Sequence, residues 1–173
     1  TINGNVSAQS AIFNADYDAN GTGTFTIASG YDITSTDNQS ISITANDIDI
    51  YSLGTISSGT GSTTIAVSDG RTIGLGGVSG NMSITAGELG RITAGTLNIG
   101  DSSTGNITVD GISAANSNNV TTVSLTTASG SSTSFSNNDS TFNALTSNGG
   151  STSFGSGLTI ATDTGKLSID SAS

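Results

Sequence analysis

One stretch of the sequence has the residue types and the spacing of a calcium loop. Asp16, Asp18 and Asn20 place carboxylate and amide oxygens at alternating positions, and Gly21 follows them. Alternating oxygen ligands with a glycine for the sharp turn are typical of the start of an EF-hand loop. Thr22 would add a backbone carbonyl. The sequence therefore predicts a metal site at Asp16, Asp18, Asn20 and Thr22, and calcium is the one cofactor that it suggests.

The same loop has a second interpretation. The twelfth position of a calcium loop holds a glutamate that binds the ion through both oxygens, and Ile27 stands there in this chain. Asn14 and the hydroxyl of Thr24 are the compensating oxygen ligands that the neighbouring sequence offers. Without the bidentate anchor, the stretch also fits an acidic, Asn-Gly-rich turn that binds no metal. Both interpretations stay open at the level of sequence.

Three further acidic residues have structural interpretations. Asp47 and Asp49 alternate with isoleucines, and this period of two places their carboxylates on the outer face of a strand. Glu88 is the only glutamate and lies close to Arg91 in a glycine-containing segment. We expect these two to form a solvated salt bridge in a turn.

Catalysis has few residues to use. The chain has no histidine and no cysteine, which excludes Ser-His and Cys-His nucleophiles. A pair of carboxylates for glycoside hydrolysis is compatible with the 13 acidic residues. The three cations, Arg71, Arg91 and Lys166, are too scattered for the basic cluster of a polysaccharide lyase. We therefore expect no catalytic residues and no enzymatic activity, and a polysaccharide-active enzyme is the last of three function classes.

The charge of the chain restricts its partners. The formal net charge is −10, which opposes binding to the phosphates of nucleic acid and to anionic lipid headgroups. No apolar run is long enough to span a membrane. The balance suits a solvated extracellular surface, so we expect secretion or display at the cell surface.

Short segments in which apolar and small polar residues alternate recur along the whole chain. Three of them lie between Met82 and Asp110, separated by glycine-rich turns. In the last third, Phe135, Phe142 and Phe154 occupy the inward positions that Ile and Leu hold earlier. Helix is disfavoured by the Gly, Ser, Thr and Asn content. We expect the one helix-tolerant patch, residues 86 to 91, to be a turn or loop.

Paired segments recur at roughly 20 to 25 residues, a period at which stacked repeats are the first architecture to consider. No segment can bury a core alone, and the 32% hydrophobic content indicates a core about one side chain thick. We predict an all-β fold with little or no helix: a parallel β-helix, or β-solenoid, of roughly eight coils over residues 1–173 as a single domain.

The segment from Ile41 to Ile112 carries a resemblance. Its runs SISITANDIDI, GTISSGTGSTTIAVSDGRTIGLG, MSITAGELGRITAGTLNIGD and GNITVDGI resemble the repeat regions of large secreted bacterial exoproteins, the filamentous-haemagglutinin-like adhesins. The resemblance implies a right-handed parallel β-helix that is exported to the cell surface and acts as an adhesin or an extended filament. It covers somewhat under half the chain, and the amino-terminal secretion domain of that family is not visible in the sequence.

The two ends of the sequence fit each other. Written head to tail, residues 166–173 and 1–9 read as neighbouring coil segments, and neither carries a polar cap. Isolated solenoids need such caps to protect their open strand edges. We expect a segment of a longer solenoid, or a unit that associates end to end into filaments. A single domain capped by its loops is the alternative.

Asparagine allows glycosylation and side-chain ladders. In a secreted eukaryotic protein, Asn-x-Ser/Thr triplets on exposed turns accept glycans, although a chain this rich in Asn, Ser and Thr also forms them by chance. Asn side chains can also form ladders along stacked strands. The triplets begin at Asn5, Asn20, Asn38, Asn81, Asn106, Asn119 and Asn138.

The favoured function is an extracellular structural or adhesive rod, with surface glycans or other cells as partners. A ligand-binding rod that holds ice or glycans is the alternative. Ice binding predicts Thr-x-Thr at one fixed place in each coil, which residues 22–26 and 34–36 satisfy and most other coils do not.

Overall fold

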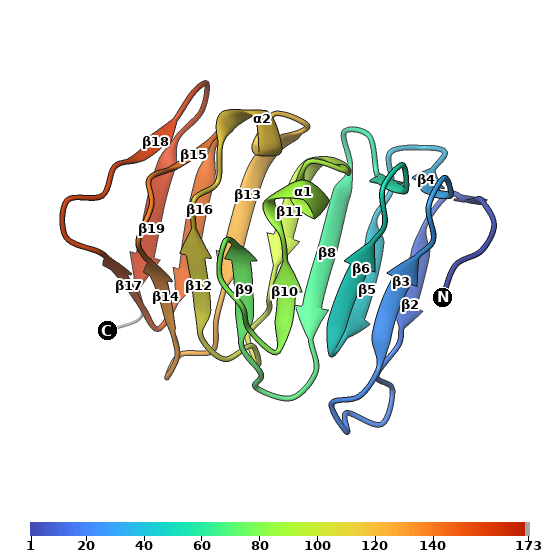
Figure 1. Ribbon diagram of the computed structural model, residues 1–173, viewed down its shortest axis with the longest axis horizontal. Helices are drawn as coiled ribbons and strands as arrows, with labels where there is room; N and C mark the ends of the chain where they lie inside the picture. The colour runs from blue at the N-terminus through green and yellow to red at the C-terminus, as the bar shows by residue number, and fades with distance from the viewer. Residues whose placement is uncertain (172–173) are drawn as a thin grey trace.

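The computed structural model describes residues 1–171, and most of its regular structure is short parallel strands (Figure 1). Strands hold 49% of the residues and helices 5%, so the fold is all-β, as the sequence predicts. The strands follow one another along the long axis from the N-terminal end to the C-terminal end in the order of the chain, except that β10 lies before β9. We call each successive turn of the chain a layer, and a strand pairs mainly with strands of the neighbouring layers.

The largest sheet contains ten strands, and all of its pairs are parallel. β11 joins its two branches, because the start of this strand pairs with β7 and the remainder with β8. The strands are β1 (Val6–Ala8), β2 (Ala11–Asn14), β4 (Asp32–Ser35), β5 (Ile41–Ala45), β7 (Thr55–Ser57), β8 (Ser62–Val67), β11 (Ile92–Ile99), β13 (Val120–Thr126), β16 (Leu145–Gly149) and β19 (Leu167–Ser171).

The remaining strands form one five-stranded and two two-stranded sheets, again parallel. The five-stranded sheet has the order β10 (Met82–Ile84), β9 (Ile73–Gly76), β12 (Ile107–Asp110), β14 (Ser132–Phe135), β17 (Ser151–Phe154). The pairs are β3 (Thr24–Ile27) with β6 (Asp47–Ile50), and β15 (Ser140–Phe142) with β18 (Ile160–Thr162). Two short helices complete the described residues, α1 (Ala86–Leu89) and α2 (Ala114–Ser117).

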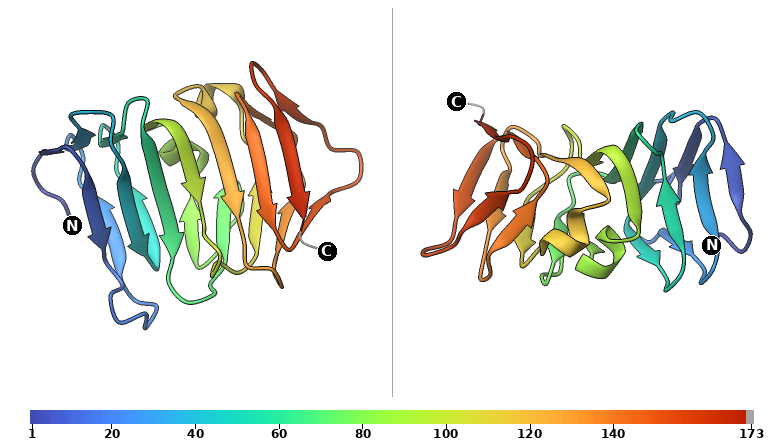
Figure 2. Two further views of the ribbon diagram at one scale, coloured as in Figure 1. Left: turned by 180° about the vertical axis from the view of Figure 1, so that it is seen from behind. Right: turned by 90° about the horizontal axis from the view of Figure 1, so that it is seen from above.

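The core lies between two rows of strands that face each other across the molecule (Figure 2). Register places equivalent apolar residues opposite one another from strand to strand, so that they form columns. In one row Ile43, Ile65, Ile99 and Leu125 succeed one another, and all are fully buried or nearly so. Alternation along each strand directs these side chains inward and the polar ones outward. The inward apolar residues therefore form a continuous buried column along this row.

The phenylalanines continue a column of the opposite row. Leu75, Val109, Phe135 and Phe154 face one another in register. Phe135 is buried, whereas Phe154 is 49% exposed and its ring stacks on that of Phe135 at 5.3 Å. Phe142 is fully buried. The inward positions expected for Phe135 and Phe142 are confirmed, and Phe154 lies in register but half open to solvent.

One connection departs from the regular layering. β10 returns to pair in parallel with β9, directly preceding it along the row, with Ile73 opposite Met82. The returning chain passes so close to β9 that a Cβ on Gly74 would lie 2.3 Å from the carbonyl oxygen of Val78. A Cβ on Gly80 would lie 2.5 Å from the amide nitrogen of Gly74. Glycine is required at both positions because two backbones approach without room for a side chain.

We call residues 77–91, which contain β10 and α1, the β10–α1 insertion. It places β10 beside β6, where the amide N–H of Ser83 donates to Asp47 Oδ1 at 2.8 Å. The insertion lengthens the chain between layers: Thr64 and Asn98, which face each other, are 34 residues apart. The facing pair Thr108 and Ser134 is separated by 26. The insertion therefore interrupts the layering between β8 and β11.

The expectation of a turn or loop at residues 86–91 is wrong, because a helix begins at Ala86. Thr85 caps it: its hydroxyl accepts the amide N–H of Glu88 at 3.2 Å, and Glu88 Oε2 accepts the amide N–H of Thr85 at 2.8 Å. This reciprocal capping box satisfies two N–H groups that the first turn leaves without helical partners. The cap outweighs the poor helix propensity of the glycines.

Candidate functional site

The predicted calcium loop lies between β2 and β3 and is held by hydrogen bonds within the protein. Asp16 is buried, and its carboxylate accepts the hydroxyl of Ser68 and the amide N–H of Gly21 at 3.1 and 3.2 Å. The Ser68 hydroxyl lowers the pKa of Asp16 against the effect of burial, and the nearby Arg71 guanidinium lowers it further. Arg71 covers the loop, since a Cβ on Gly21 would lie 2.0 Å from its Nη2.

The other predicted ligands lie in the same loop but bond to one another. Asn20 Nδ2 donates to Asp18 Oδ2 at 2.7 Å, and Asn20 Oδ1 accepts the amide N–H of Thr22 at 3.0 Å. The amide N–H of Asp16 donates to Asn14 Oδ1 at 3.1 Å. A calcium ion would therefore have to replace these donors and lie near the positive charge of Arg71. Calcium at Asp16, Asp18, Asn20 and Thr22 stays a prediction.

Asp47 and Asp49 lie on the outer face of β6, as their alternation with isoleucine predicts. Asp47 Oδ1 accepts the amide N–H groups of Ile48 at 3.0 Å and Ser83 at 2.8 Å. Asp49 lies near Asp47 and Glu88. Burial raises the pKa of the Asp49 carboxyl, and the charges of Asp47 and Glu88 raise it further. Asp47 therefore fixes β10 to β6, and Asp49 adds negative charge to the adjoining surface.

Glu88 has a different role from the one expected. It is buried rather than solvated, and Oε1 accepts the amide N–H of Ile50 at 2.9 Å. Arg91 Nη1 donates to the carbonyl oxygen of Ile50 at 3.0 Å. The two side chains therefore hold both backbone groups of Ile50, the last residue of β6. The expectation of a solvated salt bridge in a turn is wrong, because the buried Glu88 carboxylate accepts a backbone N–H of β6 as a neighbouring strand would.

A groove opens where the β10–α1 insertion meets β6. Its volume is about 340 Å³. Tyr51 is 56% exposed, so the groove presents an aromatic ring, charges of both signs and hydroxyl groups. We call it the β6–α1 groove; its lining residues are Asp49, Ile50, Tyr51, Ser52, Ser83, Thr85, Glu88 and Arg91.

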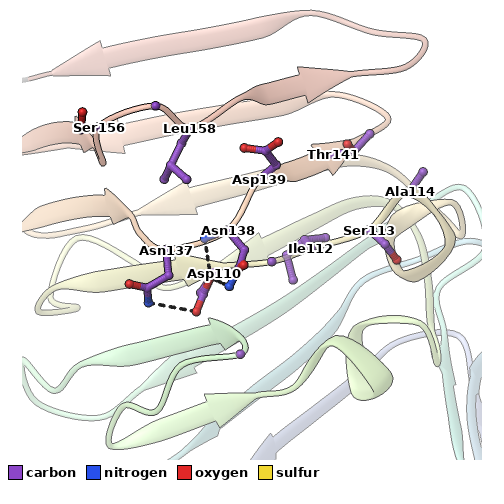
Figure 3. Close-up of a pocket in the computed structure, with 13 residues that line it drawn as sticks. Asp110, Ile112, Ser113, Ala114, Asn137, Asn138, Asp139, Thr141, Ser156 and Leu158 are labelled. Carbon is purple, nitrogen blue, oxygen red and sulfur yellow. Dashed lines mark hydrogen bonds between the residues drawn. The ribbon is translucent and has the colours of Figure 1, made fainter.

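A second, larger hollow of about 880 Å³ lies beside α2, between the turns that follow β12, β14 and β17 (Figure 3). Figure 3 shows Asn137 and Asn138 directed at Asp110. The Asn138 side-chain amide and backbone N–H donate to Asp110 Oδ1 at 2.9 and 3.0 Å, and Asn137 Nδ2 donates to Oδ2 at 3.1 Å. Asp139 and Leu158 also line the hollow.

The Asp110 carboxylate has a structural role, because it holds the turn that contains Asn137 and Asn138. Burial alone would raise the pKa of this carboxyl, but the hydrogen bonds from Asn137 and Asn138 outweigh it and lower the pKa. A carboxylate held ionised by several donors is poorly suited to act as a general acid. Asn137 has a positive φ of 58°, so Asp110 stabilises a left-handed turn that shapes the hollow.

The asparagines of the seven glycosylation triplets are all exposed. Several bridge to the next layer: Oδ1 of Asn5 accepts the amide N–H of Asp32 at 3.0 Å, and that of Asn106 accepts Ser132 at 2.9 Å. These bonds run from side chain to backbone, which differs from the amide ladder expected. Asn138 uses its amide nitrogen on Asp110, so a glycan there would break that bond. Glycosylation itself stays a prediction.

Sequence reasoning missed the β6–α1 groove, although one signal was present. Thr85-Ala86-Gly87-Glu88 has the spacing of a capping box, which marks the start of α1. The convergence of Tyr51, Asp49 and Arg91 had no local signal, since it depends on the return of β10 beside β6.

The comparisons with known proteins found no matching family model, no matching curated protein and no matching solved structure. Among residues 1–171, the helices are too short to cross a membrane.

Proposed function

We propose that the chain is a right-handed parallel β-helix that serves as a structural or adhesive rod on the outside of a cell. The observation that supports it is the register of the core. Equivalent apolar residues follow one another from layer to layer in both rows, as in the columns through Ile65 and Val109. Parallel strands joined by crossovers are right-handed almost without exception.

A rod of this kind suits mechanical work more than chemistry. Each added layer extends a β-stack by about 4.8 Å and bonds to its neighbours along the whole strand. The surface is acidic and rich in hydroxyl and amide groups, which favours solubility and opposes binding to nucleic acid. These properties support secretion and display at the cell surface.

End-to-end association is part of the proposal. Phe154, Leu167 and Ile169 in the last strands are 49%, 40% and 37% exposed. β17 and β19 each have one strand partner within the described residues. An open edge with partly exposed apolar side chains is a template for another strand. A further layer, from a second copy or from continuing chain, would cover these side chains.

Small-angle scattering and sedimentation of the purified chain test the rod and its association separately. We expect an elongated particle whose mass rises with protein concentration. Phe154→Asp should abolish the rise in mass and preserve the elongated monomer, whereas Tyr17→Asp, at a fully open loop position (90% exposed), should change neither. A monomer at every concentration would contradict association, and a spherical particle would contradict the rod.

Antibodies against the chain test its location. They should label intact cells of the source organism. Labelling that requires permeabilised cells would contradict display at the surface.

One observation favours the alternative, a rod that binds ice or glycans. Thr64, Asn98, Ser124 and Thr146 lie opposite one another on the outer face of successive strands. This file places one short polar side chain at a fixed position in each of these layers, although only Thr64 and Thr146 are threonines. A thermal-hysteresis measurement separates the two functions: a shape change of growing ice crystals would support ice binding, and normal growth would contradict it.

A further inference from the structure

We propose that the β6–α1 groove binds one neutral sugar ring at the end of a glycan chain. The proposal deepens the adhesive role proposed above and depends on it for its biological meaning, but its chemistry depends on the groove alone. Three kinds of group that recognise a sugar converge there: the exposed ring of Tyr51, the carboxylate of Asp49 and the guanidinium of Arg91. They come from β6, its following turn and the residues after α1.

The groove is held in place before any ligand arrives. Glu88 and Arg91 bond the amide N–H and the carbonyl oxygen of Ile50 at 2.9 and 3.0 Å. Ile50 lies between Asp49 and Tyr51, so the backbone that carries both side chains is fixed on each side. Fixed groups lose little entropy when a ligand binds, and affinity gains accordingly. The capping box of Thr85 and Glu88 stabilises the opposite wall in the same way.

The size of the groove restricts the ligand. Pockets for small molecules range from about 300 to 1,000 Å³, and the groove, at about 340 Å³, lies at the lower end. That volume accommodates one pyranose ring and not an oligosaccharide. We therefore assign the groove to a single terminal residue.

The charges of the groove oppose an anionic ligand. Asp49 and Glu88 line the groove and Asp47 lies near them, so three carboxylates stand against the one guanidinium of Arg91. An anionic sugar would be repelled by these carboxylates, whereas a neutral sugar would not. A neutral ring with hydroxyl groups on its edge and C–H groups on its face satisfies the groove without a net charge.

The polar side chains of the groove can form hydrogen bonds with the hydroxyl groups of a sugar. A carboxylate accepts several hydrogen bonds and a guanidinium carries five N–H donors. Glu88 accepts three hydrogen bonds, one from Ile50 and two from Thr85, and these engage both of its carboxylate oxygens. Within residues 1–171, the Arg91 side chain donates one hydrogen bond, from Nη1 to the carbonyl oxygen of Ile50. Asp49 and Arg91 are therefore the groups that would contact sugar hydroxyls, with Tyr51 beneath the ring.

Ligand-observed NMR of the full chain with the methyl glycosides of glucose, galactose, mannose and N-acetylglucosamine tests the proposal. We expect at least one to bind with a Kd of about 1 mM, as single rings on open grooves do. Tyr51→Ala should weaken that binding at least about tenfold, because the platform is lost. Tyr51→Phe should keep it, and Asp49→Asn should weaken it by about fivefold, since a carboxylate acceptor becomes a neutral amide.

Tyr17→Ala is the matched control, because Tyr17 is exposed in a loop outside the groove. It should leave the affinity unchanged. No binding by any of the four glycosides would overturn the proposal, as would full binding by Tyr51→Ala, or tighter binding of glucuronate or lysine methyl ester than of the neutral glycosides. Small-angle scattering on the same samples reports the rod independently, so failure of the groove and failure of the rod are distinguishable.

Discussion

The layers from β11 to β19 and the β10–α1 insertion solve the same problem in two ways. In the regular layers each strand of the ten-stranded sheet hydrogen-bonds to the next, and apolar residues such as Leu97 and Val123 align in register. Beside the insertion, β6 has β3 as its strand partner, and side chains make its hydrogen bonds to the insertion: the Ile50 amide donates to Glu88, and Asp47 accepts the Ser83 amide. Asp47 and Glu88 supply the bonds that a full strand would make.

The comparison shows where chemistry can arise in a repetitive fold. In the regular layers the backbone N–H and C=O groups hydrogen-bond to those of neighbouring strands, and short side chains point outward. The insertion brings charged and aromatic side chains together because they replace a missing strand. The β6–α1 groove therefore lies where the layering is interrupted, and departures from regular structure are expected at functional sites.

The largest expected effect is on stability, and it differs between a core residue of a regular layer and one of the insertion. Leu97→Ala should lower the free energy of unfolding by about 2–5 kcal/mol, because Leu97 is fully buried in a strand paired on both sides. Met82→Ala in the insertion should cost less, since β10 has one strand partner, β9, among the described residues. Urea unfolding followed by circular dichroism measures both. A larger cost for Met82 would mean that the insertion, and not the regular layer, anchors the core.

Glu88→Ala should cost about 1.5–3 kcal/mol, because the buried amide N–H of Ile50 loses a charged acceptor and the cap of α1 is lost with it. Glu88→Gln retains the shape and one carbonyl acceptor, and it should cost less. The same unfolding experiment compares the two variants. Equal stability of Glu88→Ala and the parent chain would contradict the view that Glu88 replaces a strand partner.

Gly74→Ala should cost about 1–3 kcal/mol, because its Cβ would collide with the backbone at Val78 and push the returning chain away from β9. Gly4→Ala is the matched control: a Cβ there meets no atom within 4 Å, and the change should stay within about 0.5 kcal/mol. Thermal unfolding of both variants checks the difference. A neutral Gly74→Ala would contradict the requirement for a close backbone approach.

The smallest expected effect concerns the charge of the groove. The pKa of Asp49 is raised above its ordinary value of 3.8 in the folded chain, so its ionisation opposes folding as the pH rises through that range. Asp49→Asn should stabilise the chain at neutral pH, by less than about 0.5 kcal/mol. The gain should vanish below about pH 3, where the carboxyl is largely protonated in both states. Melting temperatures across this range test it, and a gain that grows toward low pH would contradict the shift.

Much of the fold could be predicted from local pattern. The segment 40–44 alternates polar and apolar residues, and strand β5 lies there. The position of α1 was also present in the sequence as a capping box at Thr85 and Glu88, but the prediction of a turn or loop for residues 86–91 did not use it.

The sequence by itself determined which face of each strand is buried, because alternation of side chains is a property of the extended backbone and needs no partner. Only the tertiary structure decided which strands pair, and with that the return of β10 beside β6 and the meeting of Tyr51, Asp49 and Arg91. Pairing depends on contacts between residues far apart in the chain, such as Glu88 and Ile50, 38 positions apart. No local pattern records such a distance.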